Sequence, residues 1–484
     1  MLFKAHPRSL DKKFCALTFL LLFSSIAIFA CMNWLNGKFK TATLDAILFT
    51  LNAQIGGTPM ELIYSFARGV ILAPLGAAVL LTFIFAYSTG KFGVKKGFIY
   101  LCVTAVFCAS LAKAAVNLDV YGFTTNSLSA STFIDDNYKH VTAADVVFPV
   151  KKKNLILIVP ESLENTFYDE ALGWNLIPYM QSLQSGQPSF SGQRQVYGTG
   201  YTVAGITSML FGVPLKLPIG GNRYDDGKFK VFLPEAVSIL EVLEGHGYSM
   251  NVMVGSDIGH GGRGNLFRTH TKKCNIYDLD YFKSRLDTKT FKLNERWGAR
   301  DKLLFQEVKE IFRKLHEAPE PFFMFILTVD THNSAIAYGD YPTPYGDERD
   351  SFVAADCMLK KFLEWIKGQD FFEDSVVAVI GDHFYMGASV GKMKIPASYQ
   401  RSTYNVFLNS GYNEEDIEER RDFATFDLAP TLLESIGCKL PEHKFGLGVS
   451  LFSREKTLLE RYGLATVNEE LGKRSELYDS FFGF

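Results

Sequence analysis

The sequence lacks a charge excess, a disulfide framework, internal repeats and low-complexity tracts. Its 484 residues contain 50 Lys and Arg against 52 Asp and Glu, so the net charge is −2. This balance gives no global basic field, which argues against a nucleic-acid partner. Seven cysteines are too few for a disulfide scaffold of this length, and most of them lie in apolar segments. The composition therefore indicates neither a nucleic-acid-binding protein nor a disulfide-stapled secreted domain.

Hydrophobic residues, in contrast, are abundant and concentrated near the N-terminus. They make up 47% of the chain, against 21% for charged residues. Three runs carry no charge, at 14–34, 69–87 and 97–112. Because a hydrocarbon core of about 30 Å needs about 20 apolar residues in a helix, we predict a membrane anchor of three transmembrane helices within 1–116. A cleavable signal peptide is the alternative for the first run, but its length exceeds the usual apolar stretch of about 7–15 residues and further spans follow.

The basic residues around these runs predict the orientation of the anchor. They precede the first run and fill the loop between the second and third: Lys4, Arg8, Lys12, Lys13, Lys91, Lys95 and Lys96. Cytoplasmic segments of membrane proteins carry such an excess of Lys and Arg. Three crossings then place the chain after about residue 116 outside the cytoplasm.

Two connecting segments have a different character from the spans. Between the first two runs, apolar residues recur at helical spacing: Leu44, Ile47, Leu48, Leu51 and Ile55. This spacing predicts a short helix that lies on the outer leaflet or packs against the spans. Residues 117–153 are polar and mixed, which predicts a tether on the outer side. Residues 154–484 then predict a separate globular domain.

After residue 153, short apolar runs alternate with longer amphipathic ones, which is typical of an α/β domain. The runs that predict strands end at carboxylates and histidines: 154–160 before Glu161, 250–255 before Asp257 and His260, 322–329 before Asp330 and His332, and 375–381 before Asp382 and His383. Helices are predicted at 234–245 (with Pro234 in its first turn), 300–317, 353–369 and 428–436. Near-continuous apolar strands fit a mostly parallel sheet between helices, in which the carboxyl ends of the strands meet at one crevice.

Asp382 and His383 are adjacent at the end of a predicted buried strand. Taken singly, Asp and His after a strand also serve as helix caps and turn formers. Together they offer a carboxylate oxygen and an imidazole nitrogen to one cation, and Glu161 at another strand end would complete the set. Metal-assisted chemistry is therefore the leading hypothesis for this domain.

The segment 196–215, VYGTGYTVAGITSMLFGVPL, predicts a tight turn followed by a helix that begins near Thr202. A hydroxyl there can act as a nucleophile on a phosphoryl group, which the unpaired N–H groups of a helix N-terminus attract. A hydroxyl at this position is equally typical of an N-cap. The pattern alone leaves both roles open for Thr202.

Five segments carry a resemblance to a known family. They are NLILIVPESLENTFYD (154–169), GTGYTVAGITSMLFGVPL (198–215), TVDTHNS (328–334), GDHFYMGAS (381–389) and FDLAPTLLESIG (426–437). Together, in this order, they resemble the alkaline phosphatase/sulfatase superfamily. Within it the chain is similar to membrane-anchored phosphoglycerol transferases, the branch of lipoteichoic acid synthase and of the enzyme that decorates periplasmic glucans. The resemblance implies that 154–484 form a sulfatase-like catalytic domain.

This resemblance also implies a set of metal ligands: Glu161, Thr202, Asp382 and His383. Thr202 would double as the nucleophile. The ion would be divalent, with manganese expected and zinc or magnesium as alternatives. Such an ion would activate the hydroxyl and polarise a phosphoryl oxygen.

Further positions match residues that face the substrate in the family. His332 matches the histidine beside the phosphate or leaving group, and it would protonate the departing alkoxide. His260, Arg263 and Arg268 lie in GSDIGHGGRGNLFRTH (255–270), where the family holds substrate, although the spacing around the two arginines departs from that of lipoteichoic acid synthase. The alternative for this segment is a polar, Gly-rich surface loop.

Departures from other branches narrow the function. Sulfatases need Cys or Ser in a C/S-x-P-x-R setting, whereas this chain has Thr202 without that pattern. Phosphoethanolamine transferases carry G-E-T after the first strand, C-G-T around the nucleophile and several disulfides. Here the corresponding triplets are PES and GYT, and the domain contains only Cys274, Cys357 and Cys438.

The resemblance therefore implies transfer of phosphoglycerol from phosphatidylglycerol to a periplasmic or cell-surface glycan (a glucan, lipopolysaccharide or capsule sugar) through a phosphothreonine intermediate. The expected location is the inner (cytoplasmic) membrane, spanned several times, with the catalytic domain facing the periplasm or outside. The expected partners are the lipid bilayer, the lipid donor and the glycan acceptor, without nucleic acid. A phosphoethanolamine transferase or lipid-headgroup phosphodiesterase is the first alternative. The second is a non-catalytic, membrane-bound glycan-binding protein.

Overall fold

The computed structural model describes residues 11–38, 60–216, 231–285, 298–332, 341–386, 395–396, 398–413 and 417–483, together with 44, 47 and 48. Leu51 and Ile55 of the predicted connecting helix lie outside these residues, as do the ends of two motif segments, 333–334 and 387–389. The chain forms two compact units. The first comprises 1–44 and 58–124, and the second comprises 45–57 and 125–484.

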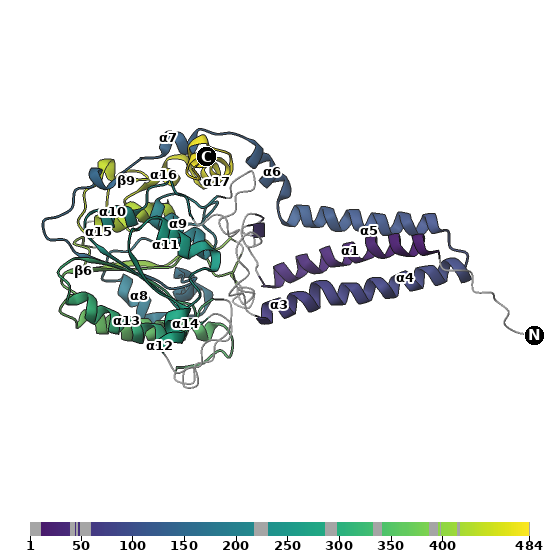
Figure 1. The fold of residues 1–484 in the computed structure, drawn as a ribbon, viewed down its shortest axis with the longest axis horizontal. Helices are drawn as coiled ribbons and strands as arrows, with labels where there is room; N and C mark the ends of the chain where they lie inside the picture. The colour runs from purple at the N-terminus through teal and green to yellow at the C-terminus, as the bar shows by residue number, and fades with distance from the viewer. Residues whose placement is uncertain are drawn as a thin grey trace, which may run out of the picture. The chain divides into compact units, whose positions relative to one another are not determined.

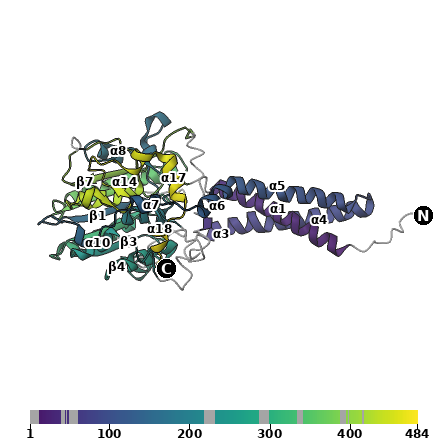
Figure 2. The ribbon, with the colours of Figure 1, turned by 90° about the horizontal axis from the view of Figure 1, so that it is seen from above.

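The first unit consists of apolar helices that run side by side (Figures 1 and 2). Their bounds are α1 Lys12–Lys38, α3 Met60–Phe66, the π-helical turn η1 Ala67–Leu72, α4 Ala73–Lys91 and α5 Lys96–Asn117. Within the described residues, three helices are long and apolar enough to cross a membrane: Lys12–Lys38, Met60–Lys91 and Lys96–Asn117. Each predicted run lies inside one of these helices, and the orientation stays a prediction.

The segment predicted as a tether packs as part of the second unit from Thr125 onward. It contains α6 Val120–Leu128 and α7 Phe133–Asn137. Ile134, Val141 and Val146 are buried in the core of that unit. Single β-bridges join this segment to the C-terminal region: Ala130 to Arg474, Lys139 to Gly446, and Val147 to Lys439. The segment therefore differs from a free tether, because apolar side chains spaced among polar ones dock it on the domain.

A mostly parallel sheet forms the centre of the second unit. Within the described residues it has six strands in the order β4-β3-β5-β1-β6-β7. Their bounds are β1 Asn154–Val159, β3 Ser249–Val254, β4 Cys274–Tyr277, β5 Phe322–Leu327, β6 Ser375–Ile380 and β7 Asn405–Leu408. Neighbouring strands are parallel except β6 and β7, which pair antiparallel. Two small ribbons join β2 Gln193–Arg194 to β8 Phe423–Ala424 and β9 Lys444–Phe445 to β10 Gly448–Val449.

Helices cover both faces of this sheet (Figure 1). One face, with Leu155 and Leu157 of β1, packs against α9 Thr202–Phe211, α10 Ile239–Gly245, α11 Arg263–Thr269, α15 Leu428–Ser435 and the short α16 Leu458–Tyr462, α17 Leu464–Gly472 and α18 Glu476–Ser480. The other face, with Ile156 and Ile158, packs against α8 Pro178–Gln184, α12 Leu279–Arg285, α13 Asp301–His316 and α14 Arg349–Lys367. Because side chains of a strand alternate between faces, burial of both faces requires the unbroken apolar run that the sequence shows.

One predicted helix begins later than expected. We placed its start at Pro234, but α10 begins at Ile239. The Oγ of Ser238 accepts the Glu241 N–H at 3.3 Å, and the Glu241 carboxylate accepts the Ser238 N–H at 2.7 Å. This reciprocal capping box satisfies the N–H groups of Ser238 and Glu241. A proline side chain has no acceptor to offer them, so the capping box sets the start of the helix.

Candidate active site

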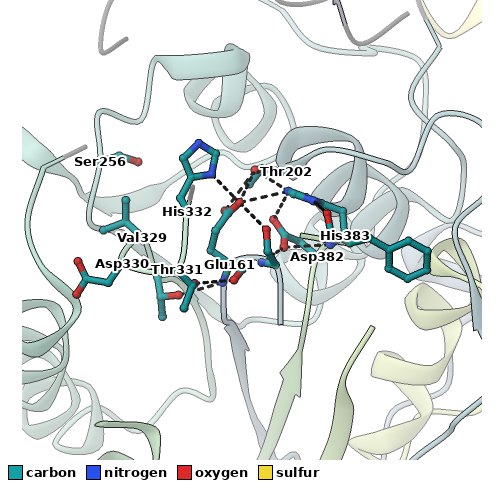
Figure 3. A network of polar contacts seen from close by, with 12 residues as sticks. Glu161, Thr202, Ser256, Val329, Asp330, Thr331, His332, Asp382 and His383 are labelled. Atoms are coloured by element: carbon teal, nitrogen blue, oxygen red, sulfur yellow. Dashed lines mark hydrogen bonds and ion pairs between the residues drawn. The ribbon is translucent and has the colours of Figure 1, made fainter. Parts of the chain in front are cut away.

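Glu161, Asp382 and His383 lie together at the carboxyl edge of the sheet (Figure 3). Glu161 follows β1 and Asp382 follows β6, and these strands pair in parallel with Ile158 opposite Val379. Parallel strands in register end at the same edge, so the residues that follow them converge. One ligand atom from each of the three residues lies within 4.8 Å of the others, and all three residues are buried. The convergence predicted from the sequence is therefore present.

The two oxygens of the Asp382 carboxylate differ in their hydrogen bonds. Its Oδ1 accepts the N–H groups of Ser162 at 2.7 Å and of His383 at 3.0 Å. Within the described part of the chain, its buried Oδ2 accepts no hydrogen bond. Burial, and then the nearby Glu161, raise the pKa of Asp382 to about 6. A buried carboxylate oxygen without a donor is what a cation ligand looks like in the absence of its cation.

His383 presents one particular nitrogen to the two carboxylates. Its Nδ1 donates to the Phe384 carbonyl at 2.8 Å, so Nε2 points inward, 3.2 Å from Glu161 Oε1 and 3.4 Å from Asp382 Oδ2. Burial opposes the charge on His383, but Asp382 and Glu161 outweigh it and raise the pKa of His383 to about 9. His383 Nε2 and one oxygen of each carboxylate meet around one point. A positive charge is needed there, either from a second proton on the imidazole or from a metal ion. Two carboxylates, an imidazole and the neighbouring hydroxyl of Thr202 fit the divalent ion that the family implies.

Thr202 begins α9, and its hydroxyl faces this group. The N-cap position belongs to Tyr201, whose backbone is extended, and no side chain caps the helix. Thr202 Oγ1 lies 3.3 Å from Glu161 Oε2 and 3.3 Å from His383 Nε2. Of the two roles left open by the sequence, the N-cap is wrong. The close approach of α9 depends on Gly205, where an added Cβ would lie 2.3 Å from the Asp382 carbonyl oxygen.

Glu161 is held on its other side by the end of β5. His332 Nδ1 donates to Glu161 Oε1 at 2.8 Å, and the His332 side chain is 24% exposed where Glu161 is buried. The hydroxyl of Thr328 accepts the Glu161 N–H, and the hydroxyl of Thr331 donates to the Glu161 carbonyl. Burial opposes ionisation of Glu161, but His332 and His383 together lower its pKa well below the usual range. The two threonines were not singled out from the sequence, although they lie in the TVDTH motif.

The predicted substrate loop divides into a buried and an exposed part. Arg263 is buried at the start of α11, and its guanidinium donates to the His260 and Asp257 carbonyls and to Ser256 Oγ. Burial lowers the pKa of Arg263 to about 10, and the negative charges of Glu161 and Asp382 partly offset this. The guanidinium therefore holds the backbone of the loop through these hydrogen bonds. Its positive charge interacts with the negative charges of Glu161 and Asp382. His260 is half-buried beside it.

Arg268 lies on the exposed surface further along α11. Its charge lowers the pKa of Cys274 on β4, against the stronger effect of burial. Among the described residues, no hydrogen bond or ion pair joins Arg268 to Glu161, Asp382 or His383. Its predicted role in substrate binding stays a prediction.

Asp330, predicted at a strand end as a potential ligand, turns away from the metal group. Its Oδ2 accepts the Asp301 N–H at 2.8 Å, while the Asp301 carboxylate accepts the N–H groups of Val329 at 2.7 Å and Asp330 at 3.2 Å. Both carboxyls are buried. Burial raises the pKa of Asp330 to about 7, and burial followed by Asp330 raises that of Asp301. The pair anchors α13 to the end of β5, next to His332.

Comparison with known proteins places this arrangement in a family. The family model for sulfatases matches residues 153–438, which include every residue of the metal group. The chain belongs to the sulfatase family. The predicted resemblance to the alkaline phosphatase/sulfatase superfamily is therefore confirmed, together with the α/β fold class.

Two curated relatives share a name. Phosphoglycerol transferase I of Xanthomonas campestris is 27% identical over 314 residues, covering 63% of this chain and 43% of the relative. Phosphoglycerol transferase I of Escherichia coli is 27% identical over 313 residues, covering 63% of this chain and 40% of the relative. Each match spans less than half the length of the relative. The solved structure of the lipoteichoic acid synthase LtaP from Listeria monocytogenes is 17% identical, covers 63% of this chain and 77% of that chain, and has a TM-score of 0.47.

Proposed function

We propose that this protein is a metal-dependent transferase that moves phosphoglycerol from phosphatidylglycerol to a periplasmic or cell-surface glycan. The observation that carries the proposal is the convergence of Glu161, Thr202, Asp382 and His383 on one buried point, with the Thr202 hydroxyl in front of it. The names of the two curated relatives support the choice of phosphoglycerol as the transferred group.

Glu161, Thr202, Asp382 and His383 would hold one divalent ion, manganese in the first instance, with zinc and magnesium as alternatives. When bound, the ion supplies Lewis-acid chemistry, which lowers the pKa of a coordinated hydroxyl and offsets negative charge on a phosphoryl oxygen. Asp382 Oδ2 is the ligand atom whose hydrogen-bonding capacity is unused by the described chain. Because Nδ1 of His383 is engaged by Phe384, Nε2 is the nitrogen available for coordination.

In the first half-reaction, Thr202 Oγ attacks the phosphorus of phosphatidylglycerol. The Thr202 hydroxyl gives its proton to water, the bond from Oγ to phosphorus forms, the bond from phosphorus to the diacylglycerol oxygen breaks, and that oxygen takes up a proton as diacylglycerol leaves. We assign delivery of that proton to His332, whose Nδ1 is held by Glu161 and whose ring lies on the more exposed side of the group. The buried positive charge of Arg263 favours a phosphoryl group over a neutral one in this region.

In the second half-reaction, a sugar hydroxyl of the acceptor displaces Thr202 from phosphorus. The new bond joins the sugar oxygen to phosphorus and the bond from phosphorus to Thr202 Oγ breaks. The released Oγ takes back a proton from water, and the proton of the sugar hydroxyl passes to His332, the group that gave one up in the first half-reaction. Both displacements take place at one site, and the covalent intermediate divides a difficult transfer into two easier steps. The acceptor would be a glucan, a lipopolysaccharide or a capsule sugar.

The apolar helices of the first unit support a lipid donor. A site attached to a bilayer meets a lipid at the high effective concentration of the membrane surface. We place the protein in the inner (cytoplasmic) membrane with its second unit on the periplasmic or outer side, because the basic residues lie in the two segments predicted to be cytoplasmic.

Reconstitution separates this proposal from its alternatives. The full chain is placed in vesicles of phosphatidylglycerol or of phosphatidylethanolamine with Mn²⁺ and a glucan acceptor, and released diacylglycerol and labelled glucan are measured. Both products from phosphatidylglycerol support the proposal. Diacylglycerol from phosphatidylethanolamine only indicates a phosphoethanolamine transferase, and headgroup release without labelled glucan indicates a phosphodiesterase. Release from neither lipid, with glucan still bound, indicates a glycan-binding protein.

A further inference from the structure

A buried ion pair lies immediately behind the metal group. Glu164 is fully buried, and Arg401 is 13% exposed. The Arg401 guanidinium contacts both carboxylate oxygens of Glu164, with Nε at 2.8 Å from Oε2 and a terminal nitrogen against Oε1. Thr166 Oγ1 also donates to Oε2 at 2.9 Å. The bidentate geometry gives this pair a defined orientation as well as energy.

The pair holds both main-chain groups of Tyr385, two residues after His383. The Tyr385 N–H donates to Glu164 Oε1 at 2.7 Å, and the Tyr385 carbonyl accepts from Arg401 at 3.0 Å. The Arg401 guanidinium also lies over the Phe384 ring, 4.8 Å from its centroid. Two charged side chains from elsewhere in the chain therefore fix the path that the backbone takes as it leaves Asp382 and His383.

The residue between them is fixed as well. The Phe384 N–H donates to Gln195 Oε1 at 3.1 Å, and the Phe384 carbonyl accepts from His383 Nδ1 at 2.8 Å. That second bond sets which nitrogen of His383 faces the metal group. The orientation of the His383 ring thus depends on the position of the Phe384 carbonyl, which in turn depends on the Tyr385 backbone.

Glu164 also ties this segment to the other ligand-bearing loop, because it follows Glu161 by three residues. Between the two, the Leu163 carbonyl accepts the Tyr404 N–H at 3.0 Å, and the Tyr404 carbonyl accepts the Gly381 N–H at 2.8 Å. An added Cβ at Gly381 would lie 2.0 Å from the Leu163 oxygen. The loops after β1 and β6 are therefore in direct backbone contact, and the Glu164 carboxylate spans them.

We propose that Glu164 and Arg401 are positioning residues that set the distance and ring orientation of the Asp382–His383 pair and thereby the affinity of the site for its divalent ion. Neither residue is a ligand. The proposal rests on the proposed metal site, and it adds residues that the family motifs did not single out. Partners behind metal ligands change metal affinity about 10–100-fold when they are removed.

The domain contains a matched control. Arg421 and Glu460 form a second bidentate pair, with Nε at 3.0 Å from Oε1 and a terminal nitrogen at 2.7 Å from Oε2, and the Arg421 side chain is 2% exposed. This pair ties the chain before β8 to the start of α16, and among the described residues no hydrogen bond or ion pair joins it to residues 381–385. Breaking either pair leaves a buried charge without its partner, so both breaks destabilise the fold.

The experiment compares Glu164→Gln and Arg401→Lys with Glu460→Gln in the full-length protein in detergent, after removal of metal by chelation. The dissociation constant for Mn²⁺ is measured by calorimetric titration, and the melting temperature is measured on the same metal-free samples. We expect Glu164→Gln and Arg401→Lys to weaken Mn²⁺ binding about 10–100-fold. Glu460→Gln is expected to lower the melting temperature with Mn²⁺ affinity within about twofold of the wild type.

The outcomes separate this inference from the proposed function. Wild-type affinity for Mn²⁺ in both Glu164→Gln and Arg401→Lys would overturn the positioning role while leaving the metal site in place. Equal loss of affinity in Glu460→Gln would also overturn it, because the effect would then be general destabilisation. A wild-type protein that binds none of Mn²⁺, Zn²⁺ and Mg²⁺ in the same titration would overturn the metal site itself. If Glu164→Gln does not fold, Arg401→Lys, which keeps the buried positive charge, decides the question alone.

Discussion

Thr202 Oγ1 lies 3.3 Å from His383 Nε2, although 181 positions separate the two residues in the chain. The hydroxyl comes from the first turn of α9 and the imidazole from the loop after β6, and Gly205 allows the two elements to meet.

Thr202→Ala is expected to lower transfer from phosphatidylglycerol by about 10³-fold or more, because it removes the proposed nucleophile. The melting temperature should change by a few degrees at most, since the hydroxyl caps no helix. Thr207→Ala is the matched control on the same helix, where the hydroxyl donates to the Val203 carbonyl. Diacylglycerol release measures both variants, and unchanged turnover in Thr202→Ala would refute the assignment.

His332→Gln is expected to slow transfer from phosphatidylglycerol by about 10²–10³-fold, because the diacylglycerol alkoxide must be protonated as it leaves. A p-nitrophenyl ester of phosphoglycerol has a leaving group that needs no proton, so its cleavage should fall much less. Parallel rate measurements with the two substrates give the comparison. An equal loss with both would assign His332 to binding rather than to proton transfer.

Addition of Mn²⁺ to the metal-free protein is expected to raise its melting temperature, because an ion that binds the folded state stabilises it. Asp382→Asn should abolish most of this rise, since it replaces the carboxylate whose Oδ2 has no donor in the described chain. Differential scanning calorimetry with and without Mn²⁺ tests this. A full thermal shift in Asp382→Asn would place the ion elsewhere.

Asp330→Asn is expected to flatten the dependence of stability on pH. In the folded protein the pKa of Asp330 is raised to about 7, whereas the unfolded value is 3.8. The folded state therefore binds more protons between these values, and stability falls as pH rises through this window, by about 1.4 kcal/mol per pH unit for one full proton. Above about pH 7 the effect is complete. Melting of metal-free wild type and variant from pH 4.5 to 8 checks the slope, and identical slopes would contradict the shift.

Gly205→Ala is expected to destabilise the second unit by about 1–3 kcal/mol, because the new methyl group would collide with the Asp382 carbonyl oxygen. The collision also moves a metal ligand, so Mn²⁺ affinity should fall with stability. Gly186→Ala, where an added Cβ meets no atom within 4 Å, should leave both nearly unchanged. Denaturant unfolding and Mn²⁺ titration of the two variants make the comparison, and equal behaviour would show that α9 can shift freely.

Much of this site could be predicted from the sequence because it follows from local pattern. Unbroken apolar runs predicted the parallel strands, and parallel strands deliver the residues after them to one edge, which brought Glu161 and Asp382 together. The same rule was wrong for two predicted strand-end carboxylates. Asp257 is exposed, and its Oδ1 accepts the Gly259 N–H at 2.7 Å. Asp330 is the second. Its strand end lies next to the start of α13, and the Asp301 N–H in the first turn of that helix donates to Asp330 Oδ2 instead.

The remaining features depend on contacts that no local pattern encodes. Glu164 meets Arg401 across 237 positions, and no residue near either one indicates the other. The role of Thr202 was undecided for a similar reason, since a nucleophile and an N-cap differ only in what the hydroxyl faces. The predicted start of α10 failed on a competing local signal, because the Ser238 capping box is stronger than a proline in the first turn.

The bonds between the segment after the first unit and the C-terminal region have a consequence for how the domain is made. Ser475 donates to Asp135 across 340 positions, and Ala130 pairs with Arg474. During synthesis, the early partners of these contacts leave the ribosome long before the late ones. The domain cannot close until nearly all of it has been made, so its first core residues stay exposed to chaperones and proteases for most of translation.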